Sequence, residues 1–171
     1  KLKTKLPLII RLLPLSDQLL LGGTLANTVL KVRGFEVGKS LIDEESLDQA
    51  AKFKSEKIIL PIDVVVRKNF AHKIIRFYSK FIKSASMLVW NGPLGMFEDE
   101  HYKHGTLSVA RVLAARSTGA AFGVCGGGET VEALKLTKMM EHVDWVSTGG
   151  GAMLSFLANQ KMPGLKGIAV I

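Results

Sequence analysis

The sequence has little of what secreted, disordered or membrane-spanning proteins need. Its 171 residues include one cysteine, so no disulfide can form within the chain. Its apolar runs are interrupted by proline or charge, and they fall short of the roughly 20 residues that cross a bilayer. Because 47% of the residues are hydrophobic, the chain can bury a core, which excludes a disordered segment. These shortages favour one globular domain of the reducing cytoplasm, with no membrane contact.

The first ten residues imitate a secretory signal, because lysines precede an apolar stretch. Arg11 interrupts that stretch and no small-residue cleavage site follows, so we expect no signal peptide. The chain has no initiating methionine and opens in mid-pattern, which is typical of a fragment. Cys125 ends the apolar run 120–125, which favours a small buried hydrophobe over a reactive thiol.

Aromatic residues are also scarce, at 7%, whereas the net charge is +8. The basic excess lies in the first half, where six basic residues from Arg67 to Lys83 follow one another without an acid. We interpret this run as a solvated helix face, with attraction of anionic ligands as the alternative. A nucleic-acid-binding domain is disfavoured, because aromatics are few and the charge lies in one segment.

Glycine is abundant, with 17 residues, and its placement is regular. Four times a strand-like apolar run leads through a glycine turn into a helix-like stretch. Those strand and helix pairs are 18–21 with 24–33, 87–90 with 99–116, 121–125 with 129–139, and 144–147 with 152–158. Between them, the β-branched run 58–66 predicts a buried strand, acids at 43–45 predict a helix start, and apolar spacing predicts an amphipathic helix over 73–84.

This alternation predicts an α/β fold, in which a parallel sheet carries helices on both faces in a Rossmann-like three-layer arrangement. In such a sheet every strand-to-helix turn lies along one edge. Four glycine turns there would direct backbone N–H groups and helix N-termini at a common anion, above all a phosphate. The simpler interpretation, that the glycines only make tight turns, would suit one turn better than four.

Two nucleotide motifs and one metal motif can be set aside. The segment 34–40 resembles a Walker A loop, but it has three residues between its glycines where the motif needs four, and it follows a helix. No strand leads into the G-x-G-x-x-G fingerprint of dinucleotide-binding proteins. His101 and His104 lie near acids, yet no further ligand spacing supports a metal pair.

Three motifs remain: W-N-G-P-L-G-M-F-E over 90–98, G-G-G-E-T over 126–130, and S-T-G-G-G-A over 147–152. In this order and spacing they resemble phosphoglycerate kinase. The resemblance runs almost end to end, since 21–28, 37–41 and 162–164 also match the family pattern. It identifies residues 1–171 as the nucleotide-binding C-terminal domain of a two-domain kinase whose substrate-binding N-terminal domain is absent from this chain.

The resemblance implies reversible phosphoryl transfer between 1,3-bisphosphoglycerate with MgADP and 3-phosphoglycerate with MgATP, a step of glycolysis. It also implies Mg²⁺ as cofactor, a cytoplasmic monomer, and contact with 3-phosphoglycerate or 1,3-bisphosphoglycerate only through the missing N-terminal half. We therefore expect the isolated chain to bind ADP or ATP without turnover. The alternative is a non-catalytic nucleotide-binding module of the same fold.

By resemblance, the site residues fall into a phosphoryl-transfer group and a nucleotide group. Lys5 matches a lysine that contacts the nucleotide phosphate and the group in flight, and Lys1 matches its partner four residues before. Gly149 and Gly150 match glycines whose N–H groups face that moving phosphoryl group. The other nucleotide-binding residues are Gly22 and Gly23 for adenine, Asn91 and Pro93 for the nucleotide-side loop, Glu98 for ribose, and Gly127, Gly128, Glu129 and Thr130 for phosphates and Mg²⁺.

The sequence departs from the family pattern within the chain at two places. Glu129 stands where the family usually has aspartate, and we expect it to serve the metal directly or through water. The resemblance also implies that the family has some tens of residues, forming a wall of the adenine pocket, between the positions of Val66 and Lys73, and this sequence lacks them. Either the segment is deleted or the sequence omits it, and the second is favoured because both flanks keep the pattern.

Overall fold

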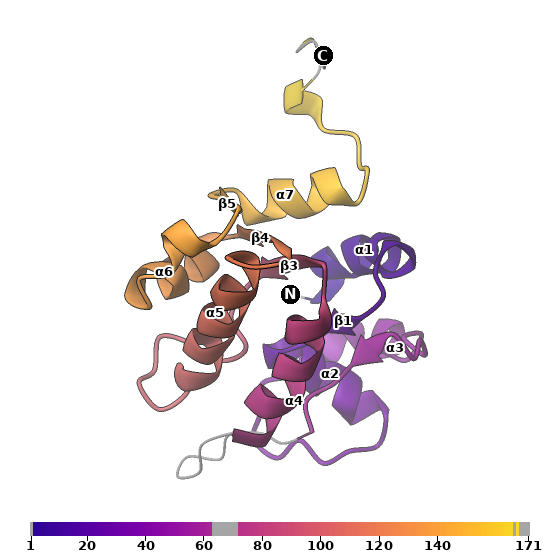
Figure 1. Ribbon diagram of the computed structural model, residues 1–171. Coiled ribbons are helices and arrows are strands. Elements are labelled where there is room, and N and C mark those ends of the chain that lie inside the picture. The colour runs from indigo at the N-terminus through magenta and orange to yellow at the C-terminus, as the bar shows by residue number, and fades with distance from the viewer. Residues whose placement is uncertain (1, 63–71, 166, 168–171) are drawn as a thin grey trace.

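The computed structural model describes residues 2–62, 72–165 and 167, in which short strands alternate with helices (Figure 1). Within those residues no helix is long and apolar enough to cross a membrane. The elements are α1 (Leu2–Leu12), β1 (Leu19–Leu20), α2 (Gly23–Val32), α3 (Leu47–Ala50), β2 (Ile58–Ile59), α4 (His72–Ser84), β3 (Met87–Asn91), α5 (His104–Ser117), β4 (Phe122–Gly126), α6 (Gly128–Leu136), β5 (Trp145–Ser147) and α7 (Gly150–Leu157).

All the strand pairs in the described residues are parallel, as the alternating pattern predicts. They form two sheets, β1–β2 and β3–β4–β5, where we expected one. The two sheets meet at their turns, because the N–H of Gly23 donates to the carbonyl oxygen of Leu94 at 2.8 Å. The α/β class is thus confirmed, but the strands are hydrogen-bonded as two separate sheets.

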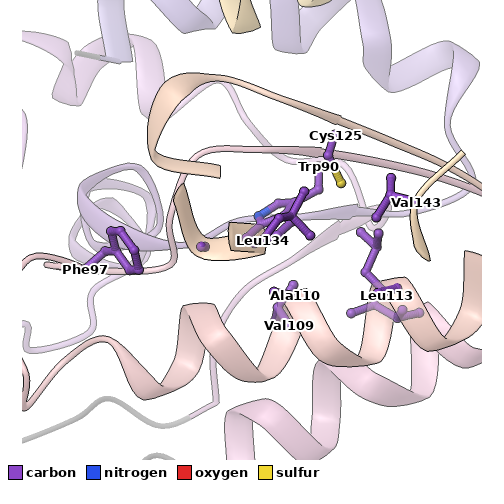
Figure 2. Packing of buried hydrophobic residues seen from close by; sticks show 11 residues of the cluster. Trp90, Phe97, Val109, Ala110, Leu113, Cys125, Leu134 and Val143 are labelled. Carbon is purple, nitrogen blue, oxygen red and sulfur yellow. The ribbon is translucent and has the colours of Figure 1, made fainter. Parts of the chain in front are cut away.

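One face of β3–β4–β5 forms the larger hydrophobic core. Trp90 of β3 and Cys125 of β4 point into this core, where they meet Leu113 of α5 and Leu134 of α6 (Figure 2). The other face carries α7, which lies across the sheet from α5 (Figure 1). Helices on opposite sides of parallel strands give the predicted three layers.

A second hydrophobic cluster surrounds β1–β2. Leu21 and Ile58 lie in it together with Ile9 of α1 and Val29 of α2. The sequence did not predict α1, which contains Pro7. Packing explains this helix, because Ile9 is buried and Leu6 packs against the same cluster, and tertiary contacts override a weak local preference.

The bounds of two predicted elements differ for identifiable reasons. The strand predicted over 58–66 is β2 at Ile58–Ile59, and residues 63–66 lie outside the described part. Pro61 follows closely and has no N–H to donate to a neighbouring strand. The helix predicted from Asp99 begins instead at His104, because the Asp99 carboxylate accepts the His101 N–H at 2.8 Å and closes a turn.

The helix predicted over 73–84 is confirmed as α4, and it joins the two parts of the fold. Tyr78 is buried on α4, and its hydroxyl donates to the carbonyl oxygen of Leu21 at 2.5 Å. Burial raises the pKa of the Tyr78 hydroxyl above its ordinary range. Arg76, Lys80 and Lys83 of the basic run are exposed, as expected for a solvated face, whereas Arg67 and Lys68 lie outside the described residues.

Candidate functional site

The four glycine turns lie together at the carboxyl-terminal ends of the parallel strands. The Gly23–Leu94 hydrogen bond joins the turns after β1 and β3. The Gly92 N–H, in the turn after β3, donates to the hydroxyl oxygen of Thr130, after β4, at 2.8 Å. The Gly127 N–H then donates to the carbonyl oxygen of Ser147, at 3.2 Å. Hydrogen bonds therefore connect the turns after β1, β3, β4 and β5 in series, and the prediction that they share one edge is confirmed.

Gly127 and Gly150 show why these turns need glycine. Gly127 has φ +102°, which side chains with a Cβ rarely adopt. At Gly150 the constraint is space, because an added Cβ would lie 2.6 Å from Gly127 Cα and 2.5 Å from Asn91 Nδ2. The backbones of two turns are therefore in direct contact at the start of α7.

Three helices begin at this edge without a side-chain cap. Gly22, Gly127 and Gly149 are the N-cap residues of α2, α6 and α7, and none has a side chain that could accept a first-turn N–H. A helix start of this kind carries partial positive charge and unpaired donors. The arrangement is suited to bind a phosphate group.

Lys5, Glu98 and Glu129, the charged site residues that the structure describes, are exposed. The Lys5 ammonium lies over the turn after β3, where a Cβ added at Gly92 would be 3.5 Å from Lys5 Nζ. Glu129 lies in the first turn of α6. Glu98 is exposed beyond the turn after β3, and no described hydrogen bond joins it to the four turns. Lys1 lies outside the described residues.

Asn91 and Thr130, both predicted to bind nucleotide, contact the protein itself. The Asn91 amide donates to the carbonyl oxygen of Gly126 at 2.6 Å, between the turns after β3 and β4. Thr130 is fully buried, and its hydroxyl accepts the Gly92 N–H. Both side chains hold the edge together, and any direct contact with nucleotide stays a prediction.

One positioning residue escaped the sequence analysis. Thr106 is fully buried in the first turn of α5, and its hydroxyl accepts the Leu94 N–H at 3.1 Å. The carbonyl oxygen of Leu94 accepts the Gly23 N–H, so Thr106 fixes the loop that joins the two sheets. The sequence contained no signal for this role, because the helix was predicted to start at Asp99, which placed Thr106 well inside it, and its partner Leu94 lies in another turn.

The prediction that Cys125 is a small buried residue is confirmed. The residue is 0% exposed, and burial raises the pKa of its thiol from 9.0 to about 12. A raised folded-state pKa favours the protonated form, so this contribution to stability is complete below pH 9 and is lost as pH rises toward 12.

We expect Cys125→Ala to remove that pH dependence. At pH 7 the variant should be less stable by about 1 kcal/mol, because a small cavity remains. Above pH 9 the parent should lose up to about 1.4 kcal/mol per pH unit relative to the variant. Urea unfolding at pH 7, 9 and 10 measures the difference, and a gap that stays constant across these values would contradict the assignment.

The parallel strands, flanking helices and glycine turns define a three-layer α/β domain whose glycine turns lie along one edge. The profile of the family described as "Phosphoglycerate kinase" matches residues 1–77 and 70–160. The chain belongs to the phosphoglycerate kinase family, as the motifs predicted.

The curated relatives are about twice as long as the matched region. The phosphoglycerate kinase of Coxiella burnetii is 35% identical over 195 aligned positions, covering 97% of this chain and 49% of the relative. That of Pelotomaculum thermopropionicum is 34% identical, with 98% and 49% covered. An alignment of 195 positions exceeds the 171 residues here, so the Coxiella relative has residues that this chain lacks. The two profile matches overlap at 70–77, beside the predicted interruption.

Solved structures that superpose on this chain are also phosphoglycerate kinases. A phosphoglycerate kinase from Coxiella burnetii superposes with a TM-score of 0.85 at 33% identity, covering 97% of this chain and 50% of its own. One from Pyrococcus horikoshii OT3 gives a TM-score of 0.79 at 25% identity, covering 97% and 49%. The matched region therefore has the fold of half a phosphoglycerate kinase.

Proposed function

We propose that this chain is the nucleotide-binding half of a phosphoglycerate kinase and binds MgADP or MgATP across the four glycine turns. The observation that carries the proposal is their serial hydrogen bonding, from Gly23–Leu94 through Gly92–Thr130 to Gly127–Ser147. The three N–H groups in that series are paired within the protein. The donors proposed to meet one polyanionic tail are therefore other N–H groups, in the first turns of the helices that the joined turns bring together. The substrate-binding half is proposed to lie in the part of the relatives that this chain does not match.

Phosphoryl transfer makes modest chemical demands on such a site. The moving group spreads charge over three oxygens, so the protein supplies position and positive potential and needs no covalent intermediate. Lys5 is proposed to supply a mobile point charge beside Gly92, and the N–H groups of Gly149 and Gly150 are proposed to face the transferring group.

Gly22 and Gly23 are proposed to bind adenine, and Gly127 and Gly128 are proposed to bind the phosphates. Lys1, Pro93 and Glu98 complete the proposed nucleotide site.

The residues present fit a magnesium ion that arrives with the nucleotide. Among the residues that the structure describes, no three His, Cys, Asp or Glu side chains gather as metal ligands. Mg²⁺ needs no such cage, because it commonly takes one or two carboxylates together with substrate phosphates and water. Glu129, exposed at the start of α6, supplies one carboxylate beside the proposed phosphate position. When bound, the ion would neutralise charge on the phosphates.

Calorimetry with an enzyme assay tests the function. Titration of the 171-residue chain with MgADP should show saturable binding, whereas a coupled kinase assay should show no turnover, because the phosphoglycerate site is proposed to lie in the half that this chain does not match. No heat of binding at millimolar MgADP would refute the nucleotide site. Turnover by a chain of verified mass would refute the division into halves.

Glu129→Asp gives a finer test of the metal. Glutamate is one methylene longer than aspartate, and Mg²⁺ holds nearly ideal octahedral geometry at about 2.0–2.1 Å. We expect the shorter side chain to change the ratio of ADP affinities measured with Mg²⁺ and with Mn²⁺ by at least roughly threefold, about 0.65 kcal/mol. Glu132→Asp, on the same helix, is the control. Identical ratios in the parent and Glu129→Asp would show that residue 129 does not serve the metal.

The alternative of a non-catalytic nucleotide-binding module keeps one supporting observation, which is the match to about half of each relative's length. The two functions differ in what happens beside a phosphoglycerate-binding half. Joining this chain to the unmatched half of the Coxiella relative should restore turnover if the chain is the catalytic nucleotide half. A fusion that binds both substrates without turnover would favour the module.

A further inference from the structure

Proline interrupts the hydrogen-bond ladder between β1 and β2. The Leu21 N–H donates to the carbonyl oxygen of Ile59 at 3.0 Å, in register with the parallel pairing of Leu20 and Ile59. Continued by one step, this register would bring the N–H of residue 61 to the carbonyl oxygen of Leu21. Residue 61 is proline, which has no N–H. The Leu21 oxygen, at the end of β1, therefore needs a donor from elsewhere.

The hydroxyl of Tyr78, on α4, supplies that donor. It donates to the Leu21 carbonyl oxygen at 2.5 Å and lies 3.4 Å from the carbonyl oxygen of Ile59, which already accepts the Leu21 N–H. Tyr78 is 2% exposed, and burial raises the pKa of its hydroxyl, so the group stays protonated and remains a donor. A helix side chain thus takes the place of a strand N–H.

The bond to Leu21 bears directly on the first glycine turn. The Leu21 carbonyl and the Gly22 N–H belong to one planar peptide unit, so holding the oxygen also fixes the direction of that N–H. On its other side the turn rests against Leu94, because a Cβ added at Gly22 would lie 2.8 Å from Leu94 Cδ2, and the Gly23 N–H donates to the Leu94 carbonyl oxygen. Tyr78 and Leu94 therefore hold the turn between them.

We propose that Tyr78 is a positioning residue of the nucleotide site: its hydroxyl replaces the N–H that Pro61 lacks and so orients the Gly22–Gly23 turn toward adenine. Tyr78 acts through Leu21, and no contact with the nucleotide is required. The inference rests on the proposed binding of adenine at this turn. It predicts that loss of the hydroxyl is repaired by a change that returns a backbone donor to the end of β1.

Four variants test the inference by calorimetry with MgADP. Tyr78→Phe removes only the hydroxyl, and we expect it to weaken binding at least roughly fivefold, because a buried carbonyl loses its donor. Pro61→Ala alone should bind within about twofold of the parent. In the double variant the N–H of residue 61 can donate to Leu21, so affinity should return to within about twofold of the parent. Tyr102→Phe removes the same atom from the other tyrosine of the chain, which is half-buried before α5, and should bind like the parent.

Hydrogen exchange tests the same link without nucleotide. In Tyr78→Phe the Gly23 amide should exchange with deuterium at least roughly fivefold faster than in the parent, whereas the amides of β4 should keep the parent rate, because only the turn is loosened. Equal acceleration in β4 would indicate general destabilisation and would overturn the inference.

Two binding results would also overturn it. One is equal MgADP affinity of the parent and Tyr78→Phe, and the other is a loss of affinity that Pro61→Ala leaves unrepaired. A parent that bound no MgADP would refute the proposed function and the role in adenine binding together. Faster Gly23 exchange in Tyr78→Phe would then still support the link from Tyr78 to the turn, and unchanged exchange would refute that link as well.

Discussion

Replacing Gly150 with alanine should lower the free energy of unfolding by about 3 kcal/mol, the upper end for overpacking a close contact. The new methyl group would lie 2.6 Å from Gly127 Cα and 2.8 Å from Gly127 N. Both atoms are backbone, so no side chain can rotate away. The turns after β4 and β5 would have to separate, and the Gly127–Ser147 hydrogen bond between them would lengthen. Urea denaturation followed by circular dichroism measures the loss.

Gly151 provides a control one residue further along α7. A Cβ added there meets no atom within 4 Å, and the residue is helical. Gly151→Ala should therefore raise stability by about 0.5 kcal/mol, because alanine prefers the helix more than glycine does. Neighbouring glycines should thus respond with opposite signs. Equal responses would show that the turns do not approach as described.

Replacing Lys5 with methionine should weaken MgADP binding roughly 30-fold, about 2 kcal/mol, which is typical of one hydrogen bond to a charged group. Methionine keeps much of the side-chain length and removes the ammonium that lies over Gly92. Because Lys5 is exposed, the fold should not change. Calorimetry at two salt concentrations measures the effect, and the difference between parent and variant should shrink at higher salt.

Lys31→Met controls for the loss of one positive charge. Lys31 is exposed in the last turn of α2, eight residues after Gly23, and a helix rises about 12 Å over that distance. The control should bind MgADP like the parent. If Lys31→Met weakened binding as much as Lys5→Met, the effect would come from net charge, and Lys5 would have no special place in the site.

The sequence predicted the fold class and the shared edge of turns because both follow from local rules. Apolar runs ending in glycine mark strand-to-helix turns, and parallel topology brings such turns to one edge. The start of α5 was predicted five residues too early, because the Asp99 side chain closes a turn that periodicity cannot reveal. α1 was missed because the burial of Ile9, a tertiary effect, stabilises a helix that contains Pro7.

The sequence named a set of candidate site residues, but it did not predict the contacts that their side chains make within the protein. Resemblance grouped Asn91 and Thr130 with nucleotide contacts, which stay predictions, and the structure adds that their side chains bond to Gly126 and Gly92. Which group a side chain reaches depends on how the turns pack, and no local pattern contains that distance. Thr106 was missed for the same reason, since its partner Leu94 lies in another turn.

The division of the strands into two sheets affects how the molecule unfolds locally. Each sheet has its own hydrophobic cluster, and in the described part of the chain no strand pairing joins β1 to β3. Segments with separate cores can unfold as separate cooperative units. Amide hydrogens of β1–β2 should therefore exchange with deuterium earlier than those of the larger cluster. A nucleotide that bridged Gly23 and Gly127 would slow exchange in both units together.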